Sequence, residues 1–325
     1  MKIVSIIIKS ITIIIIMTIY YYISCNVISF IKRKNLNNNE NNIYLLKQNI
    51  ELEKNDIKVA LCTMGKNENL YLKEFIEYYF KLGVDHIFIY DDNEANEEKM
   101  SDIMEEKFKN NVSIFNAKDL SINGQPDAFS KCYNDYKNKF EWFLMLDMDE
   151  FLYIINDTLK AYLSNKQFDE CDFIKIHWVI PSDNGLIYYD KRPLFERFKP
   201  PYFESAQIKS IIRGNISELK YWVHSPYISP FKNVTCNNEG TKIYYKDMNF
   251  QYIRPININK AYIIHFKYKS TEEFMKKFKR IDRHWSKDKQ NTQLFINLID
   301  YFKINNATKK KIIFIKNKLN ISFIK

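Results

Sequence analysis

The segment Trp142–Leu152 constrains the fold more strongly than any other part of this chain. Five apolar residues, Trp142 to Leu146, run directly into Asp147-Met148-Asp149. An apolar run of this length, bounded by charge, is typical of a strand buried on both faces of a sheet. Because side chains alternate along an extended strand, we expect Asp147 and Asp149 to project to one side and Met148 to the other. Adjacent carboxylates are hard oxygen ligands for Mg²⁺ or Mn²⁺, so we predict a divalent cation site at the end of this strand; the alternative is a solvated acidic turn.

Strand and helix patterns alternate around this segment. The predicted strands before it span residues 59–64, 84–90 and 112–115, and the predicted helices span 70–82, 97–109 and 127–139. This alternation predicts an α/β domain with a doubly wound, mostly parallel sheet. After Asp149 the pattern predicts strands at 172–180 and 262–268, a loop-rich stretch at 181–260, and two basic helices at 271–287 and 292–304.

The N-terminal region predicts a membrane anchor. Ser10 to Ile31 holds no charged residue and is long enough to span a bilayer, although a cleaved signal peptide is the competing interpretation. Basic residues flank the segment on both sides, so its orientation stays open. We predict an anchor at 1–34, a polar Asn-rich stem at 35–56, a catalytic domain at 57–270 and a basic helical extension at 271–325.

Composition excludes several classes of protein. The six glycines form neither a dinucleotide-binding motif nor a P-loop, which makes a dehydrogenase or a P-loop NTPase improbable. The five cysteines form no C-x-x-C pair, so the spacing does not indicate zinc. One or two disulfides remain possible if the domain is extracytoplasmic.

The positive charge is concentrated at the C-terminal end of the chain. Residues 267–325 carry 16 Lys and Arg against five Asp and Glu, so they account for the whole net charge of +10. Such a segment suits an anionic membrane face or a phosphorylated acceptor, although a solvated Lys-rich helical surface would have the same composition. No nucleic-acid-binding module is recognisable, and we expect no nucleic-acid partner.

Short motifs follow one another in order along most of the chain after residue 60. They are Cys62 to Glu68 with Tyr71-Leu72, Leu82 to His86, Ile89 to Asp92, Leu146 to Phe151, His177-Trp178, Asp183 to Gly185, Glu196 to Phe198, Lys209 to Ile211, and His265 to Tyr268. This ordered series resembles glycosyltransferases with the GT-A fold, specifically the family 2-like and family 92-like group. The resemblance does not cover the anchor, the stem or the last forty residues. It implies a GT-A-like catalytic domain that transfers a sugar, as a hexosyltransferase does, from a nucleotide diphosphate donor to a hydroxyl of a glycan or glycolipid acceptor.

The resemblance also implies a metal site and a donor site. Asp147 and Asp149 would bind Mn²⁺ or Mg²⁺, which neutralises charge on the diphosphate leaving group. His265 would be a third ligand, as in some enzymes of this fold, or a core histidine hydrogen-bonded to backbone. The residues expected to contact the nucleotide donor are Thr63, Asn67, Glu68, Asp91 and Asp147, with Arg197, Lys209 and Arg213 as candidates for the diphosphate. The alternative for Asp91, which ends a predicted strand, is that it only marks a turn.

An inverting transferase needs a general base to deprotonate the acceptor hydroxyl. We predict Asp183, which lies in the loop after the apolar segment 174–180. Glu196 and Glu204 are the alternatives. Because Glu196 adjoins Arg197, a structural ion pair between these two residues is the favoured interpretation of Glu196.

Two function classes remain at this point. The first is a metal-dependent, inverting glycosyltransferase in glycan or surface polysaccharide synthesis. The second is a membrane-anchored binding or scaffold protein that keeps the fold without catalysis. We expect a single-pass protein of the Golgi or secretory pathway in a eukaryote, or of the inner membrane in a bacterium. A nucleotidyltransferase is disfavoured because the loop at Thr63 to Glu68 is not the Gly-rich loop of that class. Oligomeric state is left open.

Overall fold

The structure, a computed structural model, describes residues 57–122, 124–217, 219–222, 224–226, 233–244, 251–278 and 287–319. The predicted anchor and stem therefore lie outside the described residues. None of the described helices is long and apolar enough to cross a membrane. The predicted boundary between a catalytic domain and a basic extension at residue 270 stays a prediction.

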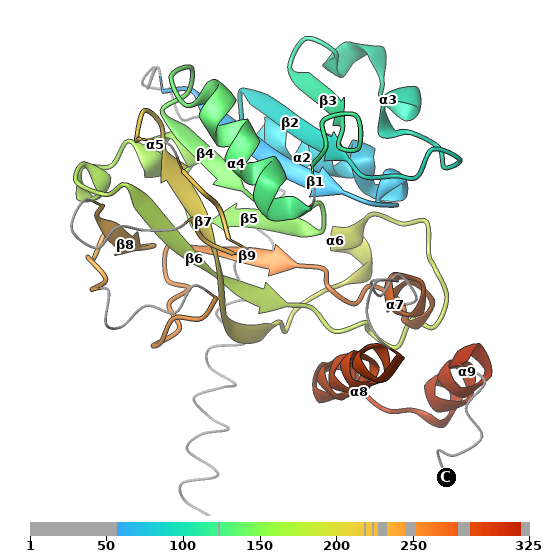
Figure 1. Cartoon of the computed structure of the whole chain (residues 1–325). Helices are drawn as coiled ribbons and strands as arrows, with labels where there is room; N and C mark the ends of the chain where they lie inside the picture. Colours follow the sequence, from blue (N-terminus) through green and yellow to red (C-terminus); the bar gives the residue numbers. More distant parts are fainter. Residues whose placement is uncertain are drawn as a thin grey trace, which may run out of the picture. The chain divides into compact units, whose positions relative to one another are not determined.

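Nine strands of the described part of the chain form one mixed sheet (Figure 1). The strands are β1 Val59–Gly65, β2 His86–Asp91, β3 Val112–Asn116, β4 Trp142–Met145, β5 Glu150–Ile154, β6 Phe173–Ile180, β7 Phe203–Arg213, β8 Thr235–Asn237 and β9 Ala261–His265. Their order is β3-β2-β1-β4-β7-β6-β9-β5, with β8 paired to β6.

The first half of the sheet is parallel, and the second half is mixed. β3, β2, β1 and β4 run parallel to one another, as the sequence predicted. β7 is antiparallel to both β4 and β6, whereas β9 is parallel to β6 and β5 is antiparallel to β9. A mixed α/β sheet with helices fits the GT-A-like fold that the resemblance implies.

Helices connect the strands and cover the sheet. They are η1 Asn69–Tyr71, α2 Leu72–Leu82, α3 Met100–Ile103, η2 Glu106–Phe108, α4 Gln125–Tyr136, α5 Leu159–Leu163, η3 Lys166–Phe168, α6 Leu194–Arg197, α7 Thr271–Phe278, α8 Lys287–Ile304 and α9 Lys309–Leu319. The predicted helix at 70–82 is observed as η1 and α2. It ends at Gly83, whose φ of 111° is accessible to glycine at little cost.

Alternation along the strands explains the main core. Ala60, Cys62, Phe143 and Met145 point to one face, where they pack against apolar residues of α4 that include Phe129. Figure 1 shows α4 lying across this face of the sheet. The intervening strand residues point the other way and are also buried, which is why these segments read as continuous apolar runs in the sequence.

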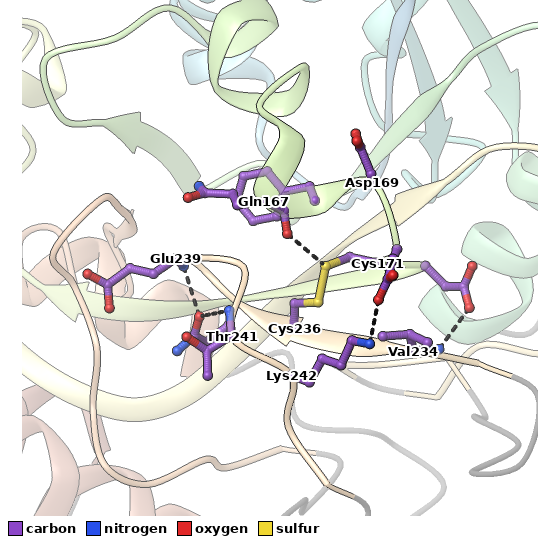
Figure 2. The surroundings of a disulfide bond; sticks show 12 residues. Gln167, Asp169, Cys171, Val234, Cys236, Glu239, Thr241 and Lys242 are labelled. Atoms are coloured by element: carbon purple, nitrogen blue, oxygen red, sulfur yellow. Dashed lines mark hydrogen bonds and ion pairs between the residues drawn. A yellow bond between two sulfur atoms is a disulfide. The ribbon is translucent and has the colours of Figure 1, made fainter.

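Two disulfides fasten connections onto the sheet. Cys62–Cys132 joins β1 to α4, and Cys171–Cys236 joins the start of β6 to β8. Figure 2 shows the second bond among the hydrogen bonds of Gln167, Val234 and Thr241. The sequence left one or two disulfides open, and the structure contains two; Cys25 lies outside the described residues.

Three expectations about secondary structure were wrong. Residues 97–109 form only α3 and η2, because the carboxylate of Asp91 accepts a hydrogen bond from the Met100 amide and ties the start of this segment to β2. Residues 181–260 contain β7 and β8 rather than loops alone. The last predicted strand ends at His265, not at residue 268.

Candidate functional site

The sheet topology brings the carboxyl ends of several strands to one edge. β1, β2, β4, β6 and β9 all run in the same direction, so their carboxyl ends meet there. β5 starts at this edge, where Glu150 lies opposite His265 in register. Ligands of open α/β sheets bind at this edge, so the acidic motif and His265 occupy the expected place.

The acidic motif is a turn rather than the end of a strand. β4 ends at Met145 and β5 begins at Glu150, and the Glu150 amide donates to the Asp147 carbonyl at 3.0 Å. The expectation that Asp147 and Asp149 share one side of an extended strand was therefore wrong. The turn separates their environments, since Asp149 is almost fully buried and Asp147 is partly exposed.

Asp149 lies between a histidine and a lysine. Nε2 of His265 is 3.4 Å from Asp149 Oδ1, and the Lys277 ammonium of α7 forms an ion pair with Oδ2. Burial alone would raise the pKa of Asp149, but the charges of Lys277 and His265 outweigh it, so the pKa lies well below its usual range. Asp149 is therefore a carboxylate at neutral pH.

Asp147 is surrounded by hydrogen-bond donors. Lys209 of β7, which is fully buried, donates to Asp147 Oδ1 at 2.9 Å and lies 3.7 Å from Glu150 Oε2. Gln125, at the start of α4, also donates to Oδ1 of Asp147. Burial and the nearby charge of Asp147 hold the pKa of Glu150 well above its usual range. Oε2 of Glu150 in turn accepts a hydrogen bond from the Asp147 backbone amide at 2.9 Å, and this bond stabilises the turn.

The donor set at this turn fits a divalent cation in part. Among the described residues, no three His, Cys, Asp or Glu side chains are grouped closely enough to hold a metal ion. Asp149 and His265 are suitably spaced for two ligands of one ion, because neighbouring donors on an octahedral ion with bonds of about 2.1 Å are about 3 Å apart. Nδ1 of His265 is buried without a hydrogen-bond partner among the described residues, so backbone does not hold the ring.

The predicted nucleotide contacts in the loops after β1 and β2 lie at the same edge, but most of these side chains or amides are already bound to other groups of the protein. Thr63 is buried in β1, and its hydroxyl has no hydrogen-bond partner among the described residues. Asn67 has a positive φ of 56°, and its backbone amide donates to Oδ1 of Asn93 at 2.6 Å. Glu68 forms a buried ion pair with Lys269 at 2.6 Å.

Asp91 was predicted either to contact the nucleoside or to mark a turn. Its Oδ1 accepts the Asn93 amide at 2.9 Å, and its Oδ2 accepts the Met100 amide at 2.8 Å. These bonds organise the loop that follows β2. The structure therefore favours the turn interpretation for Asp91.

The two candidate arginines do not join the acidic cluster. Arg197 is buried, donates to the Tyr71 hydroxyl at 2.9 Å and pairs with Glu273 at 3.4 Å. The ion pair predicted between Arg197 and Glu196 is replaced by this contact, and Glu196 is exposed. Arg213 lies opposite Trp142, at the start of β4 and so at the far edge of the sheet, where it binds backbone carbonyls such as that of Cys171. The expectation of a diphosphate contact by Arg213 was wrong.

The predicted base, Asp183, is buried in a separate network. Its Oδ1 accepts Lys311 Nζ at 2.6 Å and the Gly185 amide at 2.9 Å, and its Oδ2 accepts the Tyr301 hydroxyl. These contacts tie the loop after β6 to α8 and α9, and they argue against the role of general base. Of its two rivals, Glu204 is exposed on β7, opposite Val179.

Sequence reasoning missed two side chains of the cluster, Lys277 and Gln125. Lys277 follows Lys276 directly in α7, so no local signal distinguishes it. Gln125 stands at the start of α4, where it reads as an ordinary first-turn residue. Both reach the site through tertiary packing, which the spacing of residues along the chain does not encode.

Comparison with known families gives a clear result. A family model described as Glycosyltransferase family 92 matches residues 55–311. The chain belongs to glycosyltransferase family 92. The match includes α7 and α8, so the expectation that the resemblance leaves out the last forty residues was wrong.

Curated relatives carry the same family name. The chain is 24% identical over 241 residues to a glycosyltransferase family 92 protein of Ricinus communis, which covers 73% of this chain and 40% of the relative. It is 31% identical over 117 residues to a glycosyltransferase family 92 protein of Arabidopsis thaliana, and the aligned part is 33% of this chain and 20% of the relative. It is 28% identical over 108 residues to one of Oryza sativa subsp. japonica, where the aligned part is 33% of this chain and 18% of the relative. The chain thus spans two fifths or less of the length of these relatives.

Proposed function

We propose that this family 92 protein is a glycosyltransferase that moves a sugar from a nucleotide diphosphate donor to a hydroxyl of a glycan or glycolipid acceptor. The observation that carries the proposal is the cluster of Asp147, Asp149 and His265 at the carboxyl edge of the parallel strands, in a chain that matches the family over most of its length. An inverting, metal-dependent reaction of hexosyltransferase type is the specific form we favour.

The residues of the cluster have distinct roles in this proposal. Asp149 and His265 would hold Mn²⁺ or Mg²⁺, with Asp147 beside them. A bound cation would neutralise the charge that develops on the departing nucleotide diphosphate. Lys209 fixes Asp147 at 2.9 Å and adds positive potential beneath the diphosphate. Glu150 holds the turn through the Asp147 amide, so these contacts preorganise the site before a donor binds.

The direct test is nucleotide release from a panel of UDP- and GDP-sugars with Mn²⁺ present, with and without acceptor glycans. Wild type should release nucleotide from at least one donor, and Asp149→Asn should not. Asp157→Asn is the matched control, because Asp157 is an exposed aspartate beyond the far end of β5. If wild type releases no nucleotide from any donor but still binds one, the scaffold alternative gains support.

We also propose that the catalytic domain faces an oxidising compartment. Two disulfides within one domain support this orientation, because such bonds rarely persist in a reducing cytosol. The uncharged segment Ser10 to Ile31 would then act as a signal anchor with the domain on the lumenal or extracytoplasmic side. Protease protection of the domain in intact membrane vesicles would support the proposal, and digestion from the cytosolic side would overturn it.

A further inference from the structure

A short turn beside the acidic cluster has no part in the function proposed so far. Its described residues are 221, 222 and 224–226. It is closed by a hydrogen bond from the Trp222 backbone amide to the Ser225 carbonyl at 2.8 Å and by a bridge between Tyr221 and Pro226. The turn presents one aromatic side chain to solvent, since the indole of Trp222 is 45% exposed.

A buried lysine anchors this turn to the sheet. Nζ of Lys175 donates to Ser210 Oγ at 2.8 Å and to Ser225 Oγ at 2.5 Å, and Ser210 Oγ donates to the His224 carbonyl at 3.3 Å. Ser210 adjoins Lys209, which donates to Asp147. Through these bonds, buried side chains hold the backbone at His224 close to the acidic turn.

An aromatic contact also connects His224 to the cluster. Its ring centroid is 5.1 Å from that of Trp178, and the Trp178 ring is 4.3 Å from His265, whose Nε2 is 3.4 Å from Asp149. Both ring contacts are edge-to-face, which fixes the orientation of His224. The imidazole is therefore one aromatic ring away from the proposed metal ligand.

His224 is partly exposed, so a ligand can reach part of its ring. Its Nδ1 is buried and has no hydrogen-bond partner among the described residues, so the ring would use Nε2 rather than Nδ1 to bind a ligand. Burial, reinforced by the charge of Lys209, lowers the pKa of His224 to about 4, so the ring is neutral at physiological pH. A neutral imidazole can both donate and accept a hydrogen bond, as a sugar hydroxyl does.

We propose that this turn is the acceptor-sugar subsite, in which the Trp222 indole packs against the apolar face of a sugar ring and the His224 imidazole hydrogen-bonds a sugar hydroxyl. The proposal rests on the proposed glycosyltransferase function. An aromatic surface with a few placed polar groups is the usual composition of a small-molecule site. The location beside Asp147 and Asp149 puts the acceptor next to the donor, as group transfer requires.

The test separates transfer to an acceptor from hydrolysis of the donor. With the full-length protein in detergent, nucleotide release is measured without acceptor and with galactose, glucose, mannose, N-acetylglucosamine or lactose as acceptor. Trp222→Ala and His224→Ala should each raise the acceptor KM about tenfold or more and leave the rate of hydrolysis and the donor KM within about twofold. His224→Gln and Trp222→Phe should recover part of the loss.

Tyr244→Ala is the matched control, because Tyr244 is an exposed aromatic side chain that follows β8, near the start of β6 and so at the opposite edge of the sheet. It should change neither rate. An unchanged acceptor KM in both turn variants, or an equal fall of hydrolysis and transfer, would overturn the subsite.

A separate binding experiment distinguishes failure of the subsite from failure of the proposed glycosyltransferase function. If wild type releases nucleotide from no donor, the same five sugars are titrated by saturation-transfer NMR. Binding that Trp222→Ala and His224→Ala weaken, and Tyr244→Ala does not, would support the subsite without catalysis. No binding of any sugar by wild type would overturn it.

Discussion

Replacement of Lys311 by methionine should destabilise the domain by several kcal/mol. The side chains of Lys311 and Asp183 are 1% and 2% exposed, and their charged atoms are 2.6 Å apart. Methionine keeps most of the apolar stem but removes the ammonium, so the Asp183 carboxylate stays buried with only the Gly185 amide and the Tyr301 hydroxyl as donors. Loss of one partner of a buried ion pair typically costs about 3–5 kcal/mol. For a domain of this size that corresponds to a fall in Tm of about 6–15 °C.

The assay is thermal and urea unfolding of five proteins, namely wild type, Lys311→Met, Asp183→Asn, the double variant and a control. Lys310→Met is the matched control, because Lys310 is the exposed neighbour of Lys311 on α9 and its loss should change stability by less than about 0.5 kcal/mol. The double variant Asp183→Asn/Lys311→Met removes both charges together and should recover most of the stability, with a coupling energy of about 2 kcal/mol or more. A Lys311→Met variant that melts with the control would refute the reasoning.

The double variant also decides the role of Asp183. If the carboxylate is structural, the stable double variant should transfer sugar at close to the wild-type rate. If Asp183 is the general base, as the sequence predicted, transfer should fall by about 10² to 10⁴ while the fold is retained. Stability and transfer are measured on the same preparations, so the two roles give separate results.

Three further predictions concern the metal, pH and the membrane. Asp149→Asn should cut turnover by roughly 10²-fold or more and weaken Mn²⁺ binding measured by calorimetry, and full activity of this variant in EDTA would contradict the metal site. Burial lowers the pKa of Lys175 from 10.5 to about 7, so between these pH values the unfolded chain binds a proton that the folded chain does not. The free energy of unfolding of wild type, relative to that of Lys175→Met, should therefore rise with pH by up to about 1.4 kcal/mol per pH unit between pH 8 and 10. A difference that does not change with pH would show that Lys175 stays charged. Full-length protein should stay in the membrane pellet after a carbonate wash, whereas a chain that starts at Asn55 should be released, and full-length protein in the supernatant would mean that Ser10 to Ile31 is cleaved or peripheral.

Sequence patterns predicted the parallel half of the sheet well because each of its strands is buried on both faces. The apolar runs of β1, β2 and β4 and the amphipathic α2 carry their signal locally. β7 was missed because its eleven residues mix Glu204 and Lys209 with apolar positions, and its first residues are exposed. A strand of this kind is fixed by its neighbours β4 and β6 rather than by its own pattern.

The structure brings together Asp147, Asp149, Lys209 and His265, four of the residues that the sequence singled out. Their roles in binding a metal ion and a nucleotide donor stay predictions. The interpretation of Asp91 as a ligand and of Arg213 as a diphosphate contact was not supported, because the sequence does not show which backbone groups a polar side chain will satisfy. Asp183 illustrates the same limit, since its partners on α8 and α9 are more than a hundred residues away in the chain.

The basic C-terminal segment has a more specific electrostatic role than its composition suggests. Three of its lysines, Lys269, Lys277 and Lys311, pair with Glu68, Asp149 and Asp183 of the preceding sequence. Each of these carboxylates is almost fully buried, and the paired lysine offsets part of the cost of that burial. The basic end of the chain therefore supplies counter-charges to carboxylates of the near-neutral preceding sequence. The lysines outside these three ion pairs are the ones available to an anionic membrane or acceptor. A domain that ended at residue 270 would lack both Lys277, the ion-pair partner of Asp149, and Lys311, the ion-pair partner of Asp183.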